Sequence, residues 1–558
     1  MNRTSRRIEE KRRWTAAVLV GLLIFAGLIT GSQVQRVSAA KSGLPLGTPR
    51  LLGTPIRADL PPPTPVPMTT ATATPAPVST PMLADLQTAI RQRLFDPAAR
   101  HGRVGVKVIS LSTGKAVLDQ DADKYFIPAS NMKNFTVAAA MEKLGPNFKF
   151  VTSIYAAAPP DSSGTVKGDL RVYGRGDVSI SPPFATADPN SVDVYYERMD
   201  ALASAIAAAG VKRIEGNIIG DESYFSGHAV PYTWEWDDMQ SYDGAEVSAL
   251  PLNLNAVTLI IRGGKPGQPC SVELGPPTLV YQVTNTCVTA AAGAHRGVGL
   301  DKALERNSVV VSGSIAAGER WATSISVTHP AENFVAMVKD RLQKKGVVVT
   351  GGSRVMIPGT RPVEQTVIAH FDSPPFSEIA AKTMKPSQNM FAETILWTLG
   401  EEIGRKNGGT GDSSKLGLDV VKSFLQQQVG ITAEAFDPYD GSGMSRHDLI
   451  TPDSIVRLYT YMAKQSPNAA VWRNALAVGG VDGTLRNRFK GTKVADNFHG
   501  KTGTLDQVSA LSGYVTTASG EQLVVSIIVN NVPNIADRLR IIDGIVVQLA
   551  NYTGRVDP

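Results

Sequence analysis

The chain has 558 residues, of which 42% are hydrophobic, so it is too long for one ordinary domain and can bury sizeable cores. Much of its formal net charge of +6 lies at the start, where the first thirteen residues carry six basic and two acidic side chains. The remainder is nearly balanced and has no basic stripe interleaved with aromatic residues. This pattern argues against nucleic acid as a partner.

The basic start is followed by an apolar run without charges, 14–29, and then by the small residues Val37-Ser38-Ala39-Ala40. This order is typical of an export signal. The run is also nearly long enough to span a bilayer. Residues 1–40 are therefore predicted to be a signal peptide or an uncleaved signal-anchor that ties the chain to the membrane. In both cases the sequence from Lys41 onward is expected outside the cytoplasm, in the periplasm or at the cell surface.

Residues 41–82 are rich in Pro, Thr and Ala and cannot form a packed core, which predicts an extended linker. Folded sequence begins at residue 83. Helical periodicity over 83–94 is followed by an alternating strand, 104–111, and by a returning strand, 116–119. A further helix is expected over 135–144.

Ser130 and Lys133 stand immediately before that helix, in the sequence Ser130-Asn131-Met132-Lys133. Positions i and i+3 share one face of a helix, so the lysine amine can lie beside the serine hydroxyl. A desolvated lysine can take the proton of a serine nucleophile. Such pairs also arise by chance, and a capped helix with a solvated lysine is the simpler interpretation of these residues alone.

From 154 to 365 the chain is dominated by short strands and turns, with one expected helix at 194–209. This pattern predicts a large β-rich insertion of one or two modules. The two cysteines of the chain, Cys270 and Cys287, lie in it, and export to an oxidising compartment makes a disulfide between them plausible. Two thiols without clustered histidines do not make a metal site, and no metal is expected.

From 366 to 552 helical and strand patterns mix. Helices are expected at 376–384, 389–403, 413–428, 451–464 and 536–550, and strands at 497–504, 509–516 and 522–530. The predicted fold class is therefore α+β, with a central antiparallel sheet flanked by helices and with the first and last helices packed together.

Two further groups of residues in this last part could carry chemistry. Ser387 and Asn389 stand two apart in a tight connection between helices, where the hydroxyl can relay a proton and the amide can bind a carbonyl. An N-cap serine is the alternative interpretation. The second group is a strand with the sequence Lys501-Thr502-Gly503-Thr504. It offers a cation and a hydroxyl for a carboxylate, a glycine against which a ligand backbone can lie, and an amide for an oxyanion.

The three motifs S-x-x-K, S-x-N and K-T-G occur in the order found in penicillin-binding proteins and serine β-lactamases. Ser130 and Ser387 are 257 residues apart, far more than a minimal domain of that type needs. Over about 83–552 the chain resembles the class C low-molecular-mass penicillin-binding proteins, the D-alanyl-D-alanine carboxypeptidase/endopeptidase family. Stretches that share the resemblance include 216–221, 247–253, 440–446, 480–485 and 501–505.

The resemblance implies a β-lactamase/transpeptidase-like domain with an insertion, and a serine peptidase of peptidoglycan stem peptides that needs no cofactor. Ser130 would attack the carbonyl between two D-alanines, and Lys133 would accept its proton. Ser387, with Lys501, would pass that proton to the leaving D-alanine, and Asn389 would orient the substrate. β-Lactam antibiotics are expected to acylate Ser130 as inhibitors. Cleavage of D-Ala cross-links is a further expected activity.

The substrate-binding roles implied by the resemblance fall mainly on the late strand. Lys501 and Thr502 would hold the terminal carboxylate, and the amides of Ser130 and Thr504 would form the oxyanion hole. In relatives an aspartate of the insertion contacts the side-chain amine of the third stem residue. Asp177 is the candidate for this role, and a turn aspartate is the alternative.

The sequence departs from the family pattern in two places. Gln388 occupies a position where aspartate is common, and the segment around Asp177 lacks the usual proline. A glycine-flanked serine in Asp440-Gly441-Ser442-Gly443 is interpreted as part of a loop near the cleft, with turn chemistry as the reason for the glycines.

Two other functions compete with the peptidase. A serine β-lactamase would need fast deacylation. It would also be expected to be a compact enzyme, and the long insertion of this chain argues against that. A non-catalytic cell-wall-binding protein of the same fold is the other alternative, against which the intact Ser130, Lys133, Ser387, Asn389 and Lys501 argue.

Overall fold

The computed structural model describes residues 82–189, 191–276, 280–357 and 365–556. The predicted signal or anchor at 1–40 and all but the last residue of the predicted linker lie outside the described residues. Within the described ranges no helix combines the length and the apolarity needed to cross a bilayer.

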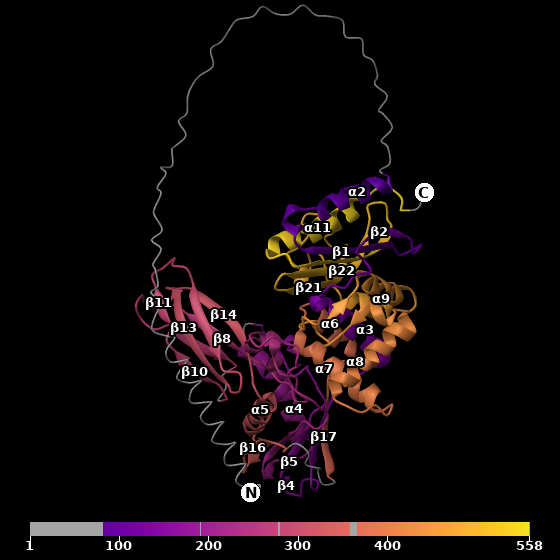
Figure 1. Cartoon of the computed structure of the whole chain (residues 1–558). Helices are drawn as coiled ribbons and strands as arrows, with labels where there is room; N and C mark the ends of the chain where they lie inside the picture. Colours follow the sequence, from indigo (N-terminus) through magenta and orange to yellow (C-terminus); the bar gives the residue numbers. More distant parts are fainter. Residues whose placement is uncertain (1–81, 190, 277–279, 358–364, 557–558) are drawn as a thin grey trace, which may run out of the picture. The chain divides into compact units, whose positions relative to one another are not determined.

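A six-stranded antiparallel sheet organises the two ends of the described chain (Figure 1). Its strand order is β2-β1-β23-β22-β21-β20. The first two strands come from the beginning of the folded sequence and the other four from its end. The bounds are β1 (Arg103–Ser110), β2 (Ala116–Gln120), β20 (Ala477–Val478), β21 (His499–Leu505), β22 (Val508–Thr516) and β23 (Gln522–Asn530).

Alternation along the strands sends side chains into two separate cores, one on each face of this sheet. Val525 and Ile527 of β23 join the core made with α2 (Leu83–Leu94) and α11 (Ile535–Asn551). Val524 and Ile528 join the core on the other face. The first and last helices therefore pack together on one face, as the sequence pattern predicts (Figure 1).

The second core is built mainly by helices from both parts of the sequence. Phe135 of the early helix and Phe391, Phe424 and Tyr459 of later helices are fully buried in it. The helices are α3 (Lys133–Lys143), α6 (Phe376–Met384), α7 (Asn389–Leu399), α8 (Ser413–Phe424), α9 (Pro452–Lys464) and α10 (Ala469–Ala475). Mixed helices and an antiparallel sheet make this an α+β fold.

The intervening segment begins with β3 (Val151–Ala156) and ends with β17 (Thr366–Asp372), and these two strands pair antiparallel. They complete a five-stranded sheet with β5 (Leu170–Tyr173), β7 (Ile218–Asp221) and β16 (Ser353–Val355). Two helices, α4 (Glu197–Ala208) and α5 (Pro330–Lys344), pack against one another and share a core with this sheet. The expectation of a single helix in this segment is thus wrong, because α5 also buries an apolar face.

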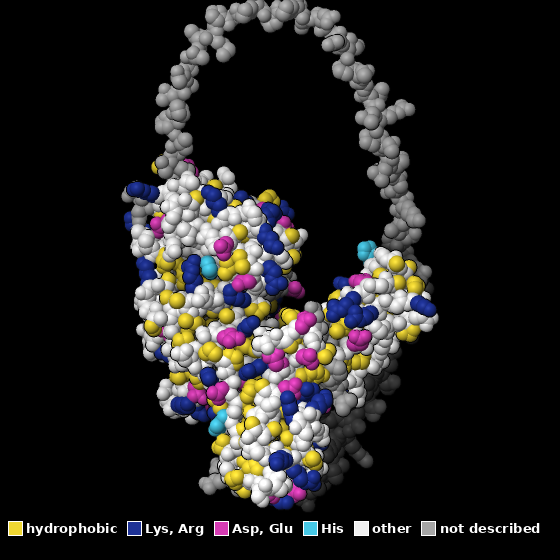
Figure 2. Space-filling model, turned by 180° about the vertical axis from the view of Figure 1, so that it is seen from behind, with side chains coloured by type: hydrophobic (Ala, Val, Ile, Leu, Met, Phe, Trp, Pro, Cys, Tyr) yellow, Lys and Arg dark blue, Asp and Glu magenta, His cyan; other side chains and the backbone are white. Residues whose placement is uncertain are grey.

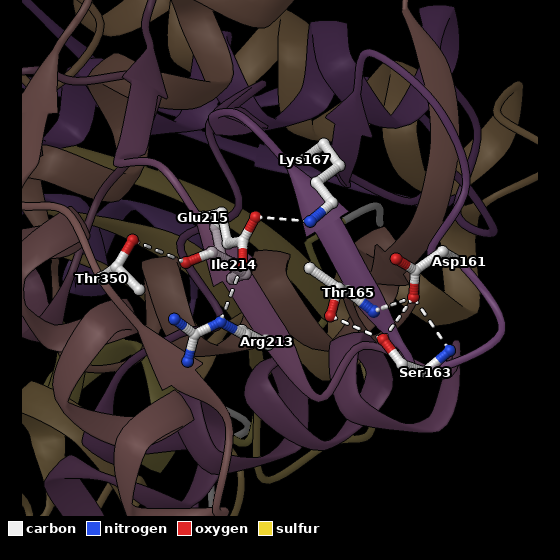
Figure 3. Close-up of polar contacts among 8 residues, drawn as sticks. All are labelled: Asp161, Ser163, Thr165, Lys167, Arg213, Ile214, Glu215 and Thr350. Carbon is white, nitrogen blue, oxygen red and sulfur yellow. Dashed lines mark hydrogen bonds and ion pairs between the residues drawn. The ribbon is translucent and has the colours of Figure 1, made fainter.

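A smaller parallel sheet lies beside these helices and consists of β15 (Val348–Val349), β6 (Arg213–Glu215) and β4 (Thr165–Lys167). Figure 3 shows its polar contacts. Lys167 and Glu215 are in register and form an exposed ion pair of 2.7 Å between Nζ and Oε2. Asp161 closes the turn before β4 by accepting hydrogen bonds from the backbone amides of Ser163 and Thr165.

The remaining strands of the intervening segment form a separate β module with two small cores of its own. One sheet pairs β14 (Arg320–Ser326), β8 (Ala256–Arg262) and β9 (Ser271–Gly275). The other is centred on β13 (Ser308–Ala316), which pairs with β10 (Gln282–Asn285), β11 (Val288–Ala290) and β12 (Gly297–Lys302). Cys270 and Cys287 form a disulfide in this module, with their Cα atoms 5.5 Å apart.

Figure 2 shows one face of the whole molecule. On this face basic and acidic side chains are interspersed.

The disulfide yields a first prediction, about stability. The Cys270→Ser/Cys287→Ser double variant should lower the free energy of unfolding of the β module by about 3 kcal/mol, because the bond closes a 17-residue separation. Calorimetry should show an earlier unfolding transition. Dithiothreitol should move the wild-type transition in the same direction and leave that of the variant unchanged. A variant with a wild-type transition would contradict the prediction.

Candidate active site

Ser130 lies in a short 3-10 turn, Ala129–Met132, that continues directly into α3. The turn begins with Ala129 at a φ of 48°, a left-handed backbone conformation that is unfavourable for a residue with a side chain. Gly443 packs against it so closely that an added Cβ would lie 1.9 Å from the Ala129 carbonyl oxygen. The turn is thus held by tertiary packing, and Ser130 does not cap the helix.

Lys133 is completely buried, and its amine is surrounded by three oxygen atoms. Its Nζ lies 2.9 Å from the Ser130 Oγ, 2.6 Å from the Asn389 Oδ1 and 2.7 Å from the Ser442 carbonyl oxygen. Burial lowers the pKa of Lys133 to about 8, and nearby carboxylates, of which Asp440 contributes most, oppose that shift. A large fraction of such an amine is neutral in mildly alkaline solution, so it can act as a base.

Ser387 precedes α7 in a strained conformation, with a φ of 71°. Its Oγ lies 2.8 Å from the Nζ of Lys501. Asn389 is the first residue of α7, and its amide Nδ2 donates to the Asp243 carbonyl oxygen at 3.1 Å. Ser387 makes no cap at this helix start, where Gln388 is the N-cap residue.

Lys501 lies on β21 and is also completely buried. Its Nζ donates to the Ser387 hydroxyl and, at 2.8 Å, to the Thr502 carbonyl oxygen. Burial, together with the charge of Lys133, holds the pKa of Lys501 well below its ordinary value. The two lysines of the predicted motifs therefore share one desolvated environment.

The residues that follow Lys501 on β21 each have a different environment. The Thr502 Oγ1 donates to the Thr484 Oγ1 at 2.7 Å, and Thr504 is exposed. At Gly503 an added Cβ would lie 2.6 Å from the Pro128 carbonyl oxygen, so a side chain there would push the strand away from the Ser130 turn. The glycine thus permits the close approach of these two elements.

Asp177 follows β5 and is buried, with only 1% of its surface exposed. Its Oδ1 accepts a hydrogen bond from the Ser179 amide at 2.9 Å, and its Oδ2 has no hydrogen-bond partner among the described residues. Burial raises the pKa of Asp177 to about 6. Within the described chain no hydrogen bond joins it to Ser130, Lys133, Ser387, Asn389 or Lys501.

Several contacts of the site lay beyond the sequence motifs. The carbonyl of Ser442, in the loop interpreted as a turn near the cleft, is a direct partner of Lys133. The Asp243 carbonyl contacts Asn389, although Asp243 belongs to the intervening segment, and Thr484 contacts Thr502. The glycines around Ser442 were a usable signal. Backbone carbonyls give no signal in a sequence, because every residue type has one.

The intervening segment also brings acidic side chains near the site. Glu235 forms a 3.9 Å ion pair with Arg446, whose guanidinium also donates to the Asp506 carbonyl oxygen just after β21. Burial and the surrounding carboxylates, including Asp506, together raise the pKa of Asp238 to about 6. The region formed by Glu235, Asp238 and Arg446 therefore combines carboxylates with an arginine.

Comparisons with known proteins show the family to which this chain belongs. Residues 86–552 match the D-Ala-D-Ala carboxypeptidase 3 (S13) family. The chain is 33% identical over 492 residues to a D-alanyl-D-alanine carboxypeptidase of Actinomadura sp. (strain R39), covering 85% of this chain and 86% of the relative. It is 26% identical over 425 residues to the D-alanyl-D-alanine carboxypeptidase DacB of Haemophilus influenzae, covering 75% of this chain and 84% of that protein.

Among solved structures, penicillin binding protein 4 (dacB) from Haemophilus influenzae has the same fold, with a TM-score of 0.70 and 23% sequence identity. The match covers 85% of this chain and 100% of that one. The family match spans most of the chain and includes all three motifs. The chain therefore belongs to the D-Ala-D-Ala carboxypeptidase 3 (S13) family of serine peptidases.

Proposed function

We propose that the chain hydrolyses the terminal D-Ala-D-Ala bond of peptidoglycan stem peptides through an acyl-enzyme on Ser130. One observation carries the assignment of residues: two buried lysines each lie within 3 Å of a serine hydroxyl, Lys133 beside Ser130 and Lys501 beside Ser387. A hydroxyl needs such a base before it can attack a carbonyl.

In the proposed acylation, neutral Lys133 takes the proton of Ser130 as its Oγ attacks the carbonyl carbon. The bond to the leaving D-alanine then breaks. Its nitrogen receives the proton that Lys133 took, relayed through the Ser387 hydroxyl, which donates its own proton and accepts that of Lys133 while Lys501 polarises it. Water subsequently hydrolyses the ester and regenerates Ser130. Asn389 is assigned to orient the substrate amide, and the hydrogen bond from its amide nitrogen to the Asp243 carbonyl supports this role by fixing the side chain.

The substrate carboxylate is assigned to Lys501 and the hydroxyl of Thr502, a cation and a donor adjacent on β21. The amides of Ser130 and Thr504 are assigned to the oxyanion, with Gly503 allowing the turn and the strand to approach. Hydrolysis of D-Ala cross-links is a second proposed activity. β-Lactams are proposed to acylate Ser130 as inhibitors, which separates a slowly deacylating peptidase from a β-lactamase.

The proposed organisation has a transpeptidase-like body in two parts, 83–153 and 366–552, around the insertion 154–365. The antiparallel pairing of β3 with β17, the strands at the two junctions between body and insertion, supports it. Peptidoglycan lies outside the cytoplasmic membrane, so the export signal or membrane anchor proposed for 1–40 fits the substrate.

A second prediction concerns the nucleophile. Ser130→Ala should abolish both the release of D-alanine from a pentapeptide and labelling by fluorescent penicillin, because among the described residues the Ser130 hydroxyl is the one that hydrogen-bonds to Lys133. Mass spectrometry of products from pentapeptide and from cross-linked muropeptide measures which bond is cut. The matched control is Ser110→Ala, a buried serine of β1 outside the site, which should retain both activities. Labelling of the Ser130→Ala protein would refute the assignment.

A third prediction concerns pH. Only the neutral form of Lys133 is a base, so kcat/KM for acylation should rise about tenfold per pH unit below an apparent pKa near 8 and level off above it. Stopped-flow acylation between pH 6 and pH 10 measures this. Lys133→Arg keeps the cation but cannot be deprotonated, so its rate should fall by at least about a hundredfold at every pH. A wild-type rate that is independent of pH would contradict this role.

A fourth prediction tests the specificity proposed for Asp177. If its buried carboxylate binds the side-chain amine of the third stem residue, Asp177→Asn should raise KM for amine-bearing stem peptides about tenfold. It should not affect peptides with an alanine at that position. Ser179→Ala, which keeps the carboxylate, is the control. An equal effect of Asp177→Asn on both peptides would assign Asp177 a structural role in the turn.

A further inference from the structure

The loop between α8 and α9 that contains Ser442 is organised around one buried carboxylate. Asp440 is 1% exposed and accepts hydrogen bonds from three backbone amides of its own loop. The Ser442 amide lies 3.0 Å and the Gly443 amide 2.6 Å from its Oδ1, and the Ser445 amide lies 2.8 Å from its Oδ2. These hydrogen bonds hold the backbone of the loop and fix the direction of the Ser442 carbonyl.

A further donor comes from the intervening segment, 206 residues earlier in the chain. The indole Nε1 of Trp234 donates to the Asp440 Oδ2 at 2.8 Å. Trp234 is 7% exposed, whereas Trp236, two residues on, is 65% exposed. A buried indole N–H normally finds a partner, and here that partner is the carboxylate that organises the Ser442 loop.

Glu393 of α7 holds the same loop from another side, because its Oε1 accepts from the Gly441 amide at 2.9 Å. α7 also supplies Asn389, one turn earlier. The Ser442 carbonyl then accepts from Lys133 at 2.7 Å. A continuous series of contacts therefore runs from Trp234, through Asp440 and the loop backbone, to the amine of Lys133.

We propose that Asp440 and Trp234 are positioning residues for Lys133, so that the insertion takes part in setting the geometry and charge of the catalytic base. Neither side chain touches the reacting atoms. Asp440 holds the Ser442 carbonyl against the amine, and Trp234 holds Asp440. This inference rests on the proposed role of Lys133, and it assigns to the insertion a contribution to the chemical step besides any contact with substrate.

The charges near Lys133 affect its protonation in addition to the hydrogen bonds that hold it. The charged or titratable groups that face Lys133 come from every element packed around it: Asp440 and Asp448 from the loop, Glu393 from α7, Asp243 from the insertion and Lys501 from β21. The carboxylates favour the ammonium form, and Lys501 opposes it. Removing the charge of Asp440 should therefore lower the pKa of Lys133.

The test is the pH profile of penicillin acylation by the full-length protein. Asp440→Asn should move the acid limb of kcat/KM down by about one pH unit, because it removes a negative charge beside the base. Trp234→Phe keeps an aromatic ring but removes the N–H. It should reduce kcat for D-alanine release about tenfold with KM within about twofold, because one hydrogen bond to a charged group is lost.

Trp472→Phe is the matched control, since this buried indole donates to the Tyr514 hydroxyl at 3.2 Å outside the series. It should lower thermal stability and leave the pH profile and kcat unchanged. A rise in KM at constant kcat in Trp234→Phe would assign Trp234 to substrate binding and overturn the inference. An acid limb of kcat/KM that is not shifted in Asp440→Asn would also overturn the inference.

Folding of each variant is checked separately by thermal unfolding. Wild-type acylation together with an inactive Ser130→Ala protein upholds the proposed function whatever these two variants show. Absence of acylation in the wild type would sink the proposed function itself.

Discussion

The burial of two neighbouring lysine amines, those of Lys133 and Lys501, is the constraint on which the rest of this structure depends. An ammonium group loses much of its hydration when it is buried, and the loss is tolerated only where oxygen atoms replace the water. Lys133 has three such oxygens, from Ser130, Asn389 and Ser442. Lys501 has the oxygens of Ser387 and Thr502. For Lys133 the same desolvation makes the neutral amine accessible, which is what the Ser130 nucleophile requires.

The fold supplies those oxygens from elements that are distant in sequence. The end of β21 and the turn before α3 can approach because Gly503 lacks a side chain, and Gly443 allows the Ser442 loop to pack on the same turn. Both close approaches use backbone atoms. The strain at Ala129, which has a positive φ, is held by this packing.

The insertion is attached to the site in the same manner. The strands at its two junctions with the body, β3 and β17, pair with one another, and its interior supplies the Asp243 carbonyl to Asn389 and the Trp234 indole to Asp440. It is therefore packed against the catalytic groups as well as joined to them by the chain. A module with such contacts can influence both which peptide binds and how the base is held.

The α+β class, the terminal helices, the three motifs and every strand of the six-stranded sheet except β20 could be predicted from the sequence, because hydrophobic periodicity and motif order are local. The sequence did not reveal α5, and it left Asp177 undecided between a binding role and a turn. Only the tertiary structure decided that the Ser442 and Asp243 carbonyls complete the site. The physical reason is that a backbone carbonyl has no side-chain signature, so its contribution is set entirely by the packing that aims it.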